Sequence, residues 1–230
     1  MLIAEDSFSA WIKVLKYIFD NGIRVGSFRE ISNLLIEIKN PSKTAENNVY
    51  FNSVGTNKYF TRFKELISTQ KHFPGKGSYL ARLKKGIYNF DQIEEIINTL
   101  LKWPQAKCAT LILIQPGKDH EAARFRCGNM PCISQLDCRI RKGYFKLTAI
   151  IRSEDVFLLG YPDYYFLGKF QENIIDIINS KPSKALINHL NLHNEDKLKS
   201  GSLFCFIING FYKIKDEINV KNLFAQAWSG

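Results

Sequence analysis

Apolar residues recur every three to four positions in several parts of the chain, which is the period of a helix packed against a core. The first helix is predicted after Ser7, which could cap it, and ends at Asn21-Gly22. Its apolar face consists of Phe8, Trp11, Ile12, Leu15, Ile18 and Phe19. A second helix is predicted to begin at Asp91, and two more are predicted over residues 164–179 and 183–192.

Shorter apolar runs predict strands between these helices. The strands are expected over residues 34–38, 108–115, 134–141, 144–152 and 203–208. The third and fourth strands form a hairpin that turns at Lys142-Gly143. The charged segment 117–128 is predicted to be a loop that leads to Cys132 at the mouth of a strand. Helices mixed with a predominantly antiparallel sheet predict an α+β fold.

Composition is that of a compact folded protein. The chain has 230 residues, of which 45% are hydrophobic and 23% charged, and this fits a single domain over residues 1–230 with a sizeable core. The apolar runs are too short to cross a bilayer, and the N-terminus lacks the pattern of a signal peptide. We therefore expect a cytoplasmic protein without a membrane partner.

Charge and cysteine content narrow the possible partners. The net charge is +10, but the basic residues are spread along the chain, which favours a lysine-rich surface over a nucleic-acid-binding patch. Five cysteines, an odd number, argue against a disulfide framework. Because no C-x-x-C spacing occurs, no metal site is predicted.

Side chains with chemical capability gather in the second half of the chain. Cys132 follows Pro131, Arg152-Ser153 lies at a predicted strand end, and Asp155 and Asp163 follow. A cysteine attacks as its thiolate, and a nearby arginine lowers the thiol pKa and can also bind a phosphate. The segment could therefore supply an attacking group, an anion-binding group and a polar side chain that reads a ring.

This segment resembles the thymidylate synthase superfamily, and above all its branch of thymidylate-synthase-like proteins and pyrimidine-nucleotide (CMP/dCMP) hydroxymethylases. RSEDVFLLGYPDYYFLGKFQE, residues 152–172, fits that branch without a gap, and NMPC, residues 129–132, is similar to the segment that holds the catalytic cysteine. Patchier similarity includes residues 24–41, 79–83 and 91–104. The resemblance implies a thymidylate-synthase-like α+β fold, with a large, mostly antiparallel sheet flanked by helices, in a homodimer that pairs sheet against sheet.

The resemblance also implies a chemistry. Cys132 would attack C6 of a pyrimidine nucleotide monophosphate and make C5 nucleophilic toward a one-carbon unit from 5,10-methylenetetrahydrofolate. Arg152 and Ser153 would bind the phosphate, Arg24 would add a second phosphate contact, and Asp155 would sit near the ring. Water would complete a hydroxymethylation, whereas hydride from the folate would complete a methylation, and the sequence leaves this choice open.

Three further positions follow from the same register. Asp163 stands where the classical enzymes carry an asparagine that reads uracil. A carboxylic group suits N3 and the 4-amino group of cytosine, so this residue favours a cytidylate as the substrate. Lys107 falls where a partner subunit contributes phosphate-binding arginines. Tyr212 falls at the tyrosine of a His-x-Tyr pair that binds the sugar hydroxyl in the superfamily, and the histidine of that pair is absent.

Each of the central residues also has a purely structural interpretation. Cys132 could be a small buried apolar residue, and Arg152 could belong to a surface ion pair. Asp155 could cap a turn, Asp163 could be a solvated turn residue, and Arg24 could be a solvated loop residue.

Several features expected of the superfamily are missing. The residue after the predicted nucleophile is Ile133 rather than histidine, and no glutamate between residues 45 and 65 clearly matches the catalytic one. The glycine expected after the Arg-Ser-x-Asp motif is displaced to Gly160. Two other functions therefore stay open, a catalytically silent nucleotide-binding protein of the same fold and a basic nucleic-acid-binding scaffold.

Overall fold

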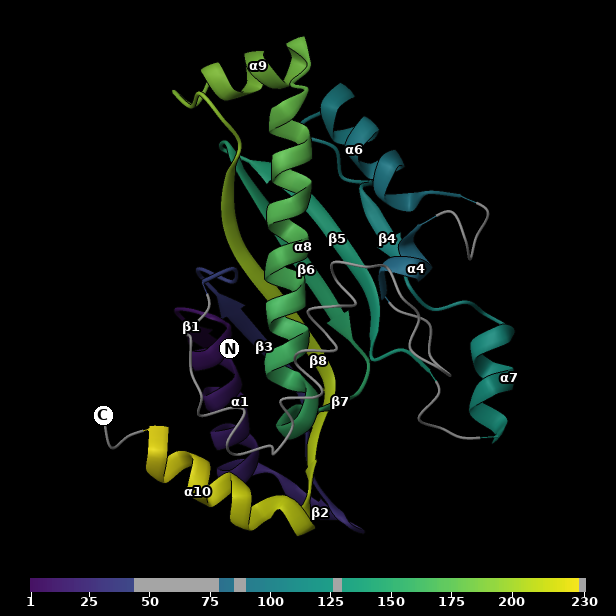
Figure 1. Ribbon diagram of the computed structural model, residues 1–230, viewed down its shortest axis with the longest axis vertical. Coiled ribbons are helices and arrows are strands. Elements are labelled where there is room, and N and C mark those ends of the chain that lie inside the picture. The colour runs from purple at the N-terminus through teal and green to yellow at the C-terminus, as the bar shows by residue number, and fades with distance from the viewer. Residues whose placement is uncertain (44–78, 85–89, 126–129, 228–230) are drawn as a thin grey trace.

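The structure is a computed structural model, which describes residues 1–43, 79–84, 90–125 and 130–227 (Figure 1). The strands are β1 (Leu2–Ala4), β2 (Ile23–Val25), β3 (Phe28–Ile38), β4 (Thr110–Ile112), β5 (Ile133–Arg141), β6 (Tyr144–Ile151), β7 (Glu154–Asp155) and β8 (Lys199–Lys213). The helices are α1 (Ser7–Asn21), α4 (Tyr79–Leu83), α6 (Gln92–Lys102), α7 (Lys118–Phe125), α8 (Tyr161–Ser180), α9 (Lys184–Asn191) and α10 (Glu217–Ala227). A π-helical turn, η2 (Val156–Gly160), precedes α8, and a 3-10 turn, η3 (Ile214–Asp216), precedes α10.

The strands form one mixed sheet in the order β1-β3-β8-β6-β5-β4, with β2 also paired to β3 and β7 to β8. The pairs β1–β3, β6–β8 and β7–β8 are parallel, and the remaining pairs in the described residues are antiparallel. The α+β class is confirmed, but the prediction of a mostly antiparallel sheet is wrong. The reason is the long crossover through α8 and α9, which returns the chain to the same end of the sheet before β8 begins, so that β8 runs parallel to β6.

Side chains of neighbouring strands form rows across the sheet, because successive residues of a strand point to opposite faces. One fully buried row consists of Ile36, Cys205, Ala149 and Leu136. The adjacent row, on the opposite face, is only half-buried and consists of Leu35, Phe206, Ile150 and Gln135. Helices α1 and α8 pack on the buried face, and α8 crosses in front of the sheet in Figure 1. The core lies between these helices and that face.

Local sequence patterns predicted the positions of several turns and helix ends correctly. The β5–β6 hairpin turns at Lys142 and Gly143, whose φ angles of 53° and 77° are those of a type I′ turn. Asp91 caps α6 as expected, since its carboxylate accepts from two backbone N–H groups. Helix α1 is capped by Asp6 instead of the predicted Ser7, whose hydroxyl donates to the carbonyl of Pro41 at 2.7 Å.

Other predicted boundaries are wrong. The strand expected over residues 108–115 is reduced to β4, and the loop expected over residues 117–128 contains α7. Helix α7 is fixed by a buried bidentate pair in which Arg82 of α4 donates to Asp119 through two bonds of 2.8 Å. Helix α10 was not anticipated, and β8 extends well beyond residues 203–208. None of the helices in the described ranges has both the length and the apolarity needed to cross a bilayer.

Gln171 connects α8 to the central pair of strands. Its side chain is fully buried, and its Nε2 donates to the carbonyls of Phe145 at 2.9 Å and Gly201 at 2.8 Å. The β6–β8 register shifts between Phe145 and Leu147, and this irregularity leaves carbonyls without a ladder partner. Gln171 therefore satisfies the buried acceptors that the shift creates.

We predict that Gln171→Met lowers the free energy of unfolding by about 2 kcal/mol, because it leaves two buried carbonyls without their donor. Urea unfolding monitored by circular dichroism would measure the change. Gln226→Met, on the exposed side of α10, is the matched control and should alter stability by no more than about 0.5 kcal/mol. Equal effects of the two substitutions would contradict the role assigned to Gln171.

Candidate functional site

Arg152 and Cys132 lie side by side at one end of the β5–β6 hairpin. Cys132 is half-buried and immediately precedes β5, and its carbonyl accepts from the backbone N–H of Arg152 at 2.9 Å. The guanidinium of Arg152 turns back toward the same segment. Its Nε donates to the carbonyl of Pro131 and its Nη2 to that of Met130, each at 2.9 Å. Arg152 thus fixes the backbone that presents the Cys132 thiol.

The turn after β7 is fixed by helix α1. Trp11 is fully buried, and its indole Nε1 donates to the carbonyl of Val156 at 2.8 Å. Gly160, at the other end of η2, lies so close to this ring that a Cβ there would come within 3.0 Å of the Trp11 side chain. The displaced glycine noted in the sequence therefore allows a close contact between η2 and α1. This contact sets where β7 ends and where α8 begins.

Four side chains form a buried polar cluster between β7, α8 and α4. Glu154 is fully buried, and one of its oxygens, Oε2, accepts from the hydroxyl of Tyr164 at 3.1 Å. Asp163 is 2% exposed, and its Oδ2 accepts from the hydroxyl of Tyr79 at 3.2 Å. Glu154 Oε1 has no hydrogen-bond partner in the described part of the chain.

The cluster is electrostatically connected to Cys132. Burial raises the pKa of Tyr79 well above its usual value, and the charges of Asp163, Cys132 and Glu154 raise it further. Tyr79 therefore stays protonated and donates to Asp163. Burial also raises the pKa of Glu154 well above its usual range, and the Asp163 charge adds to this, whereas the bond from Tyr164 opposes it. The cluster thus combines one acid that resists ionisation with two protonated phenols.

Asp155 points away from this cluster. Its carboxylate forms an ion pair with Lys213 at 3.3 Å and accepts from the backbone N–H of Leu158 at 3.4 Å, at the start of η2. Burial raises its pKa, and Lys213 counteracts this. The arrangement corresponds to the turn-capping alternative, and the catalytic role of Asp155 stays a prediction.

The remaining predicted residues lie apart from one another. Ser153 is half-buried in the step between β6 and β7, and Lys107 is exposed before β4. Arg24 is exposed on β2, where its Nε donates weakly to the carbonyl of Gly26 at 3.4 Å. Figure 1 places β2 at the lower end of the molecule, below β7. Residues 45–65, where the sequence lacks the expected glutamate, lie outside the described residues.

Tyr212 belongs to a different environment. It is fully buried on β8, opposite Arg29 of β3, and its hydroxyl has no hydrogen bond of acceptable geometry within the described ranges. Burial and the charge of Glu217 raise its pKa to about 12, although the neighbouring Arg29 lowers it. The charged groups that act on this hydroxyl are thus separate from the Glu154–Asp163 cluster.

Sequence reasoning missed Glu154 and Tyr79. One signal for Glu154 was present, because two consecutive acids, Glu154 and Asp155, precede an apolar run. Consecutive residues of a strand point to opposite faces, so one of the two acids had to face the core. Tyr79 carried no such signal, since its position depends on how α4 packs against α8.

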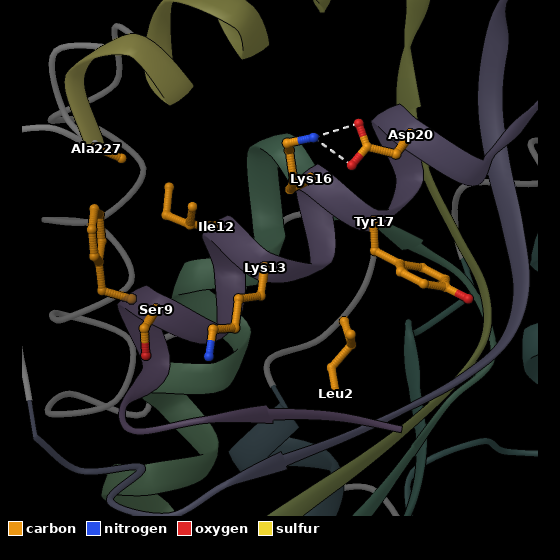
Figure 2. Close-up of a pocket in the computed structure, with 9 residues that line it drawn as sticks. Leu2, Ser9, Ile12, Lys13, Lys16, Tyr17, Asp20 and Ala227 are labelled. Atoms are coloured by element: carbon orange, nitrogen blue, oxygen red, sulfur yellow. Dashed lines mark hydrogen bonds and ion pairs between the residues drawn. The ribbon is translucent and has the colours of Figure 1, made fainter. Parts of the chain in front are cut away.

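The molecule also has an open groove of about 410 Å³ that is distinct from the cluster (Figure 2). It follows the outer side of α1 and is lined by Leu2, Phe8, Ser9, Ile12, Lys13, Lys16, Tyr17, Asp20 and Ala227. Lys16 forms an ion pair with Asp20 along its edge. None of the predicted site residues lines this groove.

Comparison with known proteins gives relatives along most of the chain, although no protein-family model matches it. The chain is 27% identical to a protein of Methanosarcina acetivorans over 200 residues, which are 84% of this chain and 88% of the relative. A protein of Methanosarcina barkeri is 27% identical over 194 residues, 81% of this chain and 85% of the relative. A protein of Methanothermobacter marburgensis is 23% identical over 200 residues, which are 80% of this chain and 87% of the relative. All three carry the provisional name thymidylate synthase, which confirms the resemblance to that superfamily and shows how far this chain has diverged.

Proposed function

We propose that this protein transfers a one-carbon unit from a reduced folate to C5 of a pyrimidine nucleotide monophosphate through a covalent adduct of Cys132. Two observations carry the proposal: Arg152 holds the segment that presents Cys132, and the charge of Cys132 acts on the hydroxyl of the hydrogen-bonded Tyr79–Asp163 pair. The names of the relatives support the same class of reaction.

The chemistry follows from these positions. The Cys132 thiolate forms a bond to C6 of the ring, and the C5–C6 π electrons move into the ring and make C5 nucleophilic. After C5 has gained the one-carbon unit, loss of the C5 proton and departure of Cys132 restore the double bond. The Tyr79 hydroxyl donates to Asp163, and this bond would orient the carboxyl group that reads the ring edge.

The cofactor would be 5,10-methylenetetrahydrofolate, which supplies an electrophilic one-carbon unit when bound. The half-buried ring of Tyr79 packs against Phe166 with centroids 5.4 Å apart, and such an aromatic surface would suit a planar pterin. Water as the final nucleophile would give a hydroxymethyl product. The chain itself would contribute the thiol and the groups that bind the ring.

Phosphate binding requires a refinement of the role of Arg152. Two of its nitrogens already donate to the carbonyls of Met130 and Pro131, whereas Nη1 has no partner in the part of the chain that the structure describes. We infer that Arg152 holds the nucleophile segment with Nε and Nη2 and meets the phosphate with Nη1, assisted by the Ser153 hydroxyl. Arg24 would add a contact from the β2–β3 hairpin.

Asp163 would select the base. A carboxyl group can accept from the 4-amino group of cytosine and share a proton with N3, whereas the N3–H and O4 edge of uracil is better matched by an amide. Asp163 is nearly fully buried, so an unmatched partner would leave polar atoms unsatisfied. A cytidylate is therefore the favoured substrate.

We predict that the protein releases tritium from [5-³H]dCMP or [5-³H]CMP in the presence of methylenetetrahydrofolate, and that Cys132→Ser abolishes the release. Cys108→Ser, at an exposed cysteine, is the control and should retain full activity. Undiminished tritium release by Cys132→Ser would show that Cys132 is not the nucleophile. No release, combined with thermal stabilisation by dCMP or CMP but not by the nucleoside, would identify a catalytically silent nucleotide-binding protein instead. Binding to oligonucleotides that weakens steeply with salt would favour the nucleic-acid-binding alternative.

We further predict that Asp163→Asn lowers the ratio of kcat/KM for cytidylate to that for uridylate by at least about tenfold, because an amide matches the uracil edge. Steady-state kinetics with the four monophosphates would measure it. Asp176→Asn, on the exposed side of α8, is the matched control and should leave the ratio unchanged. An unchanged ratio for Asp163→Asn would remove this residue as the base reader.

The open face of the sheet supports a homodimer that pairs sheet against sheet. The row of Leu35, Phe206 and Ile150 is half-buried, and Ile208 is 42% exposed on the same strand as Phe206. A second copy of the chain would cover this apolar surface. In that arrangement, the exposed Lys107 could contact the phosphate bound by the partner subunit.

We predict that the protein elutes at the mass of two chains and that Ile150→Lys shifts it to one chain, because the substitution buries an unpaired charge at the interface. Size-exclusion chromatography with light scattering would show the shift. Ile177→Lys, at an exposed position of α8, is the control and should leave the mass unchanged. A monomer at micromolar concentration in the unsubstituted protein would contradict the proposal.

A further inference from the structure

We propose that Arg82 is a positioning residue that fixes the hydrogen-bonded Tyr79–Asp163 pair relative to the segment that presents Cys132. The inference rests on the proposed function, because it gives Arg82 a part in base selection at the same site. Arg82 would not touch the nucleotide, since it would act through Tyr79.

Helix α4 depends on other parts of the fold for its position. It has five residues, whereas isolated helices shorter than about 12–15 residues are marginal in water. Contacts at its two ends therefore set its place. At the first end, the Tyr79 ring packs against Phe166, and its hydroxyl donates to Asp163 at 3.2 Å. Near the last residue, the buried side chain of Arg82 points to a different part of the molecule, the segment between β4 and α7.

Three hydrogen bonds fix the guanidinium of Arg82. Its Nη1 and Nη2 donate to the two carboxylate oxygens of Asp119 at 2.8 Å each, and Nη1 also donates to the carbonyl of Leu113 at 2.9 Å. Asp119 is held in turn by the backbone N–H of Gln115, which donates to it at 2.6 Å. Burial disfavours the charged form of Asp119, but the bonds from Arg82 and Gln115 outweigh it and hold the pKa of this carboxyl below its usual value. A bidentate pair of ionised groups fixes both the position and the orientation of the planar guanidinium.

The carbonyl that accepts from this guanidinium belongs to a segment bonded to β5. The backbone N–H of Leu113 donates to the carbonyl of Ser134 at 3.0 Å. Ser134 is the second residue of β5, the strand that begins directly after Cys132. Tyr79 and Arg82 belong to the same turn of α4. One helical turn and two hydrogen bonds thus join Tyr79 to the strand that follows the proposed nucleophile.

This connection would set the accuracy of base selection. The carboxyl group of Asp163 can discriminate between bases only if it meets the ring at a defined distance and angle while C6 lies at Cys132. A misplacement of about 1 Å can lower the rate of a well-oriented reaction by about a hundredfold. Without the fork of Arg82, the Tyr79 hydroxyl would lose its fixed distance from the nucleophile, and the carboxyl group that it orients would discriminate less.

The test replaces both members of the buried pair. A single substitution would leave the other charge buried without its partner, which can unfold the protein. Arg82→Met combined with Asp119→Leu removes both charges and keeps apolar side chains in their place, an exchange that is often close to neutral for stability. Lys16→Met combined with Asp20→Leu, at an exposed ion pair of α1, is the matched control.

The first measurement uses the protein without a ligand. Hydrogen–deuterium exchange read by mass spectrometry should show residues 79–84 exchanging at least about tenfold faster in the Arg82/Asp119 double variant, because α4 loses its fixed contact. The backbone N–H of Lys84, which donates to the carbonyl of Leu80 at 2.9 Å, reports on this helix directly. The β5–β6 hairpin should exchange as in the wild type. Unchanged exchange over residues 79–84 would overturn the role of Arg82 in holding α4.

The second measurement is the ratio of kcat/KM for cytidylate to that for uridylate. The Arg82/Asp119 double variant should lower this ratio about fivefold, whereas the control pair should leave it unchanged. In a Tyr79→Phe background, the same two substitutions should change the ratio by less than about twofold, because the hydroxyl through which they act is gone. A merely structural role predicts the same change in both backgrounds.

The outcomes separate the two proposals. Turnover of a cytidylate with the same base preference in the wild type and the double variant would overturn the role of Arg82 and leave the proposed function intact. A loss of preference that persists undiminished in Tyr79→Phe would do the same. A wild-type protein that neither binds nor converts a cytidylate would overturn the proposed function, and this inference with it. Faster exchange of α4, together with a loss of preference that requires Tyr79, would support the inference.

Discussion

The hydrogen bond from the indole of Trp11 to the carbonyl of Val156 is the contact on which the arrangement of the site depends. It joins the first helix of the chain to the π-helical turn that separates Glu154 from Asp163. A π-helical turn is rare and leaves backbone groups without standard partners, so it needs support from elsewhere in the fold. Trp11 supplies this support from 145 residues away in sequence, and Gly160 makes room for it. The two acids of the cluster are therefore placed by a helix that carries none of the predicted chemistry.

The same arrangement explains how a strongly basic chain can have an acidic centre. The net charge of +10 is spread along the chain, and Arg152, which lies next to Cys132, is engaged by the carbonyls of residues 130 and 131. An anion on Cys132 and the charges of Asp163 and Glu154 would all act on the Tyr79 hydroxyl. A neutral Glu154 removes one of these repulsive charges. The buried acids and Cys132 are therefore linked electrostatically through Tyr79.

Local sequence signals predicted much of the fold and part of the site. The Lys142-Gly143 turn, the Asp91 cap and the position of Cys132 before a strand depend on neighbouring residues, and the sequence contains those neighbours. The adjacency of Arg152 to Cys132 could also be anticipated, since a hairpin joins their strands. The parallel pairing of β8 could not, because it depends on the path of a crossover that no local pattern encodes. The burial of Glu154, the separate environment of Tyr212 and the capping role of Asp155 likewise depend on contacts with distant strands and helices.

The position of β8 has a consequence for synthesis of the chain. Strand β8 lies between β3 and β6, so it is the element that joins the N-terminal part of the sheet, β1 to β3, to the later part, β4 to β6. Among the strands of the described residues, it is also the last in sequence. Until residues 199–213 emerge, the growing chain holds two incomplete half-sheets, each with an apolar edge open to other strands. The two half-sheets are therefore exposed to misassembly until residues 199–213 have joined them.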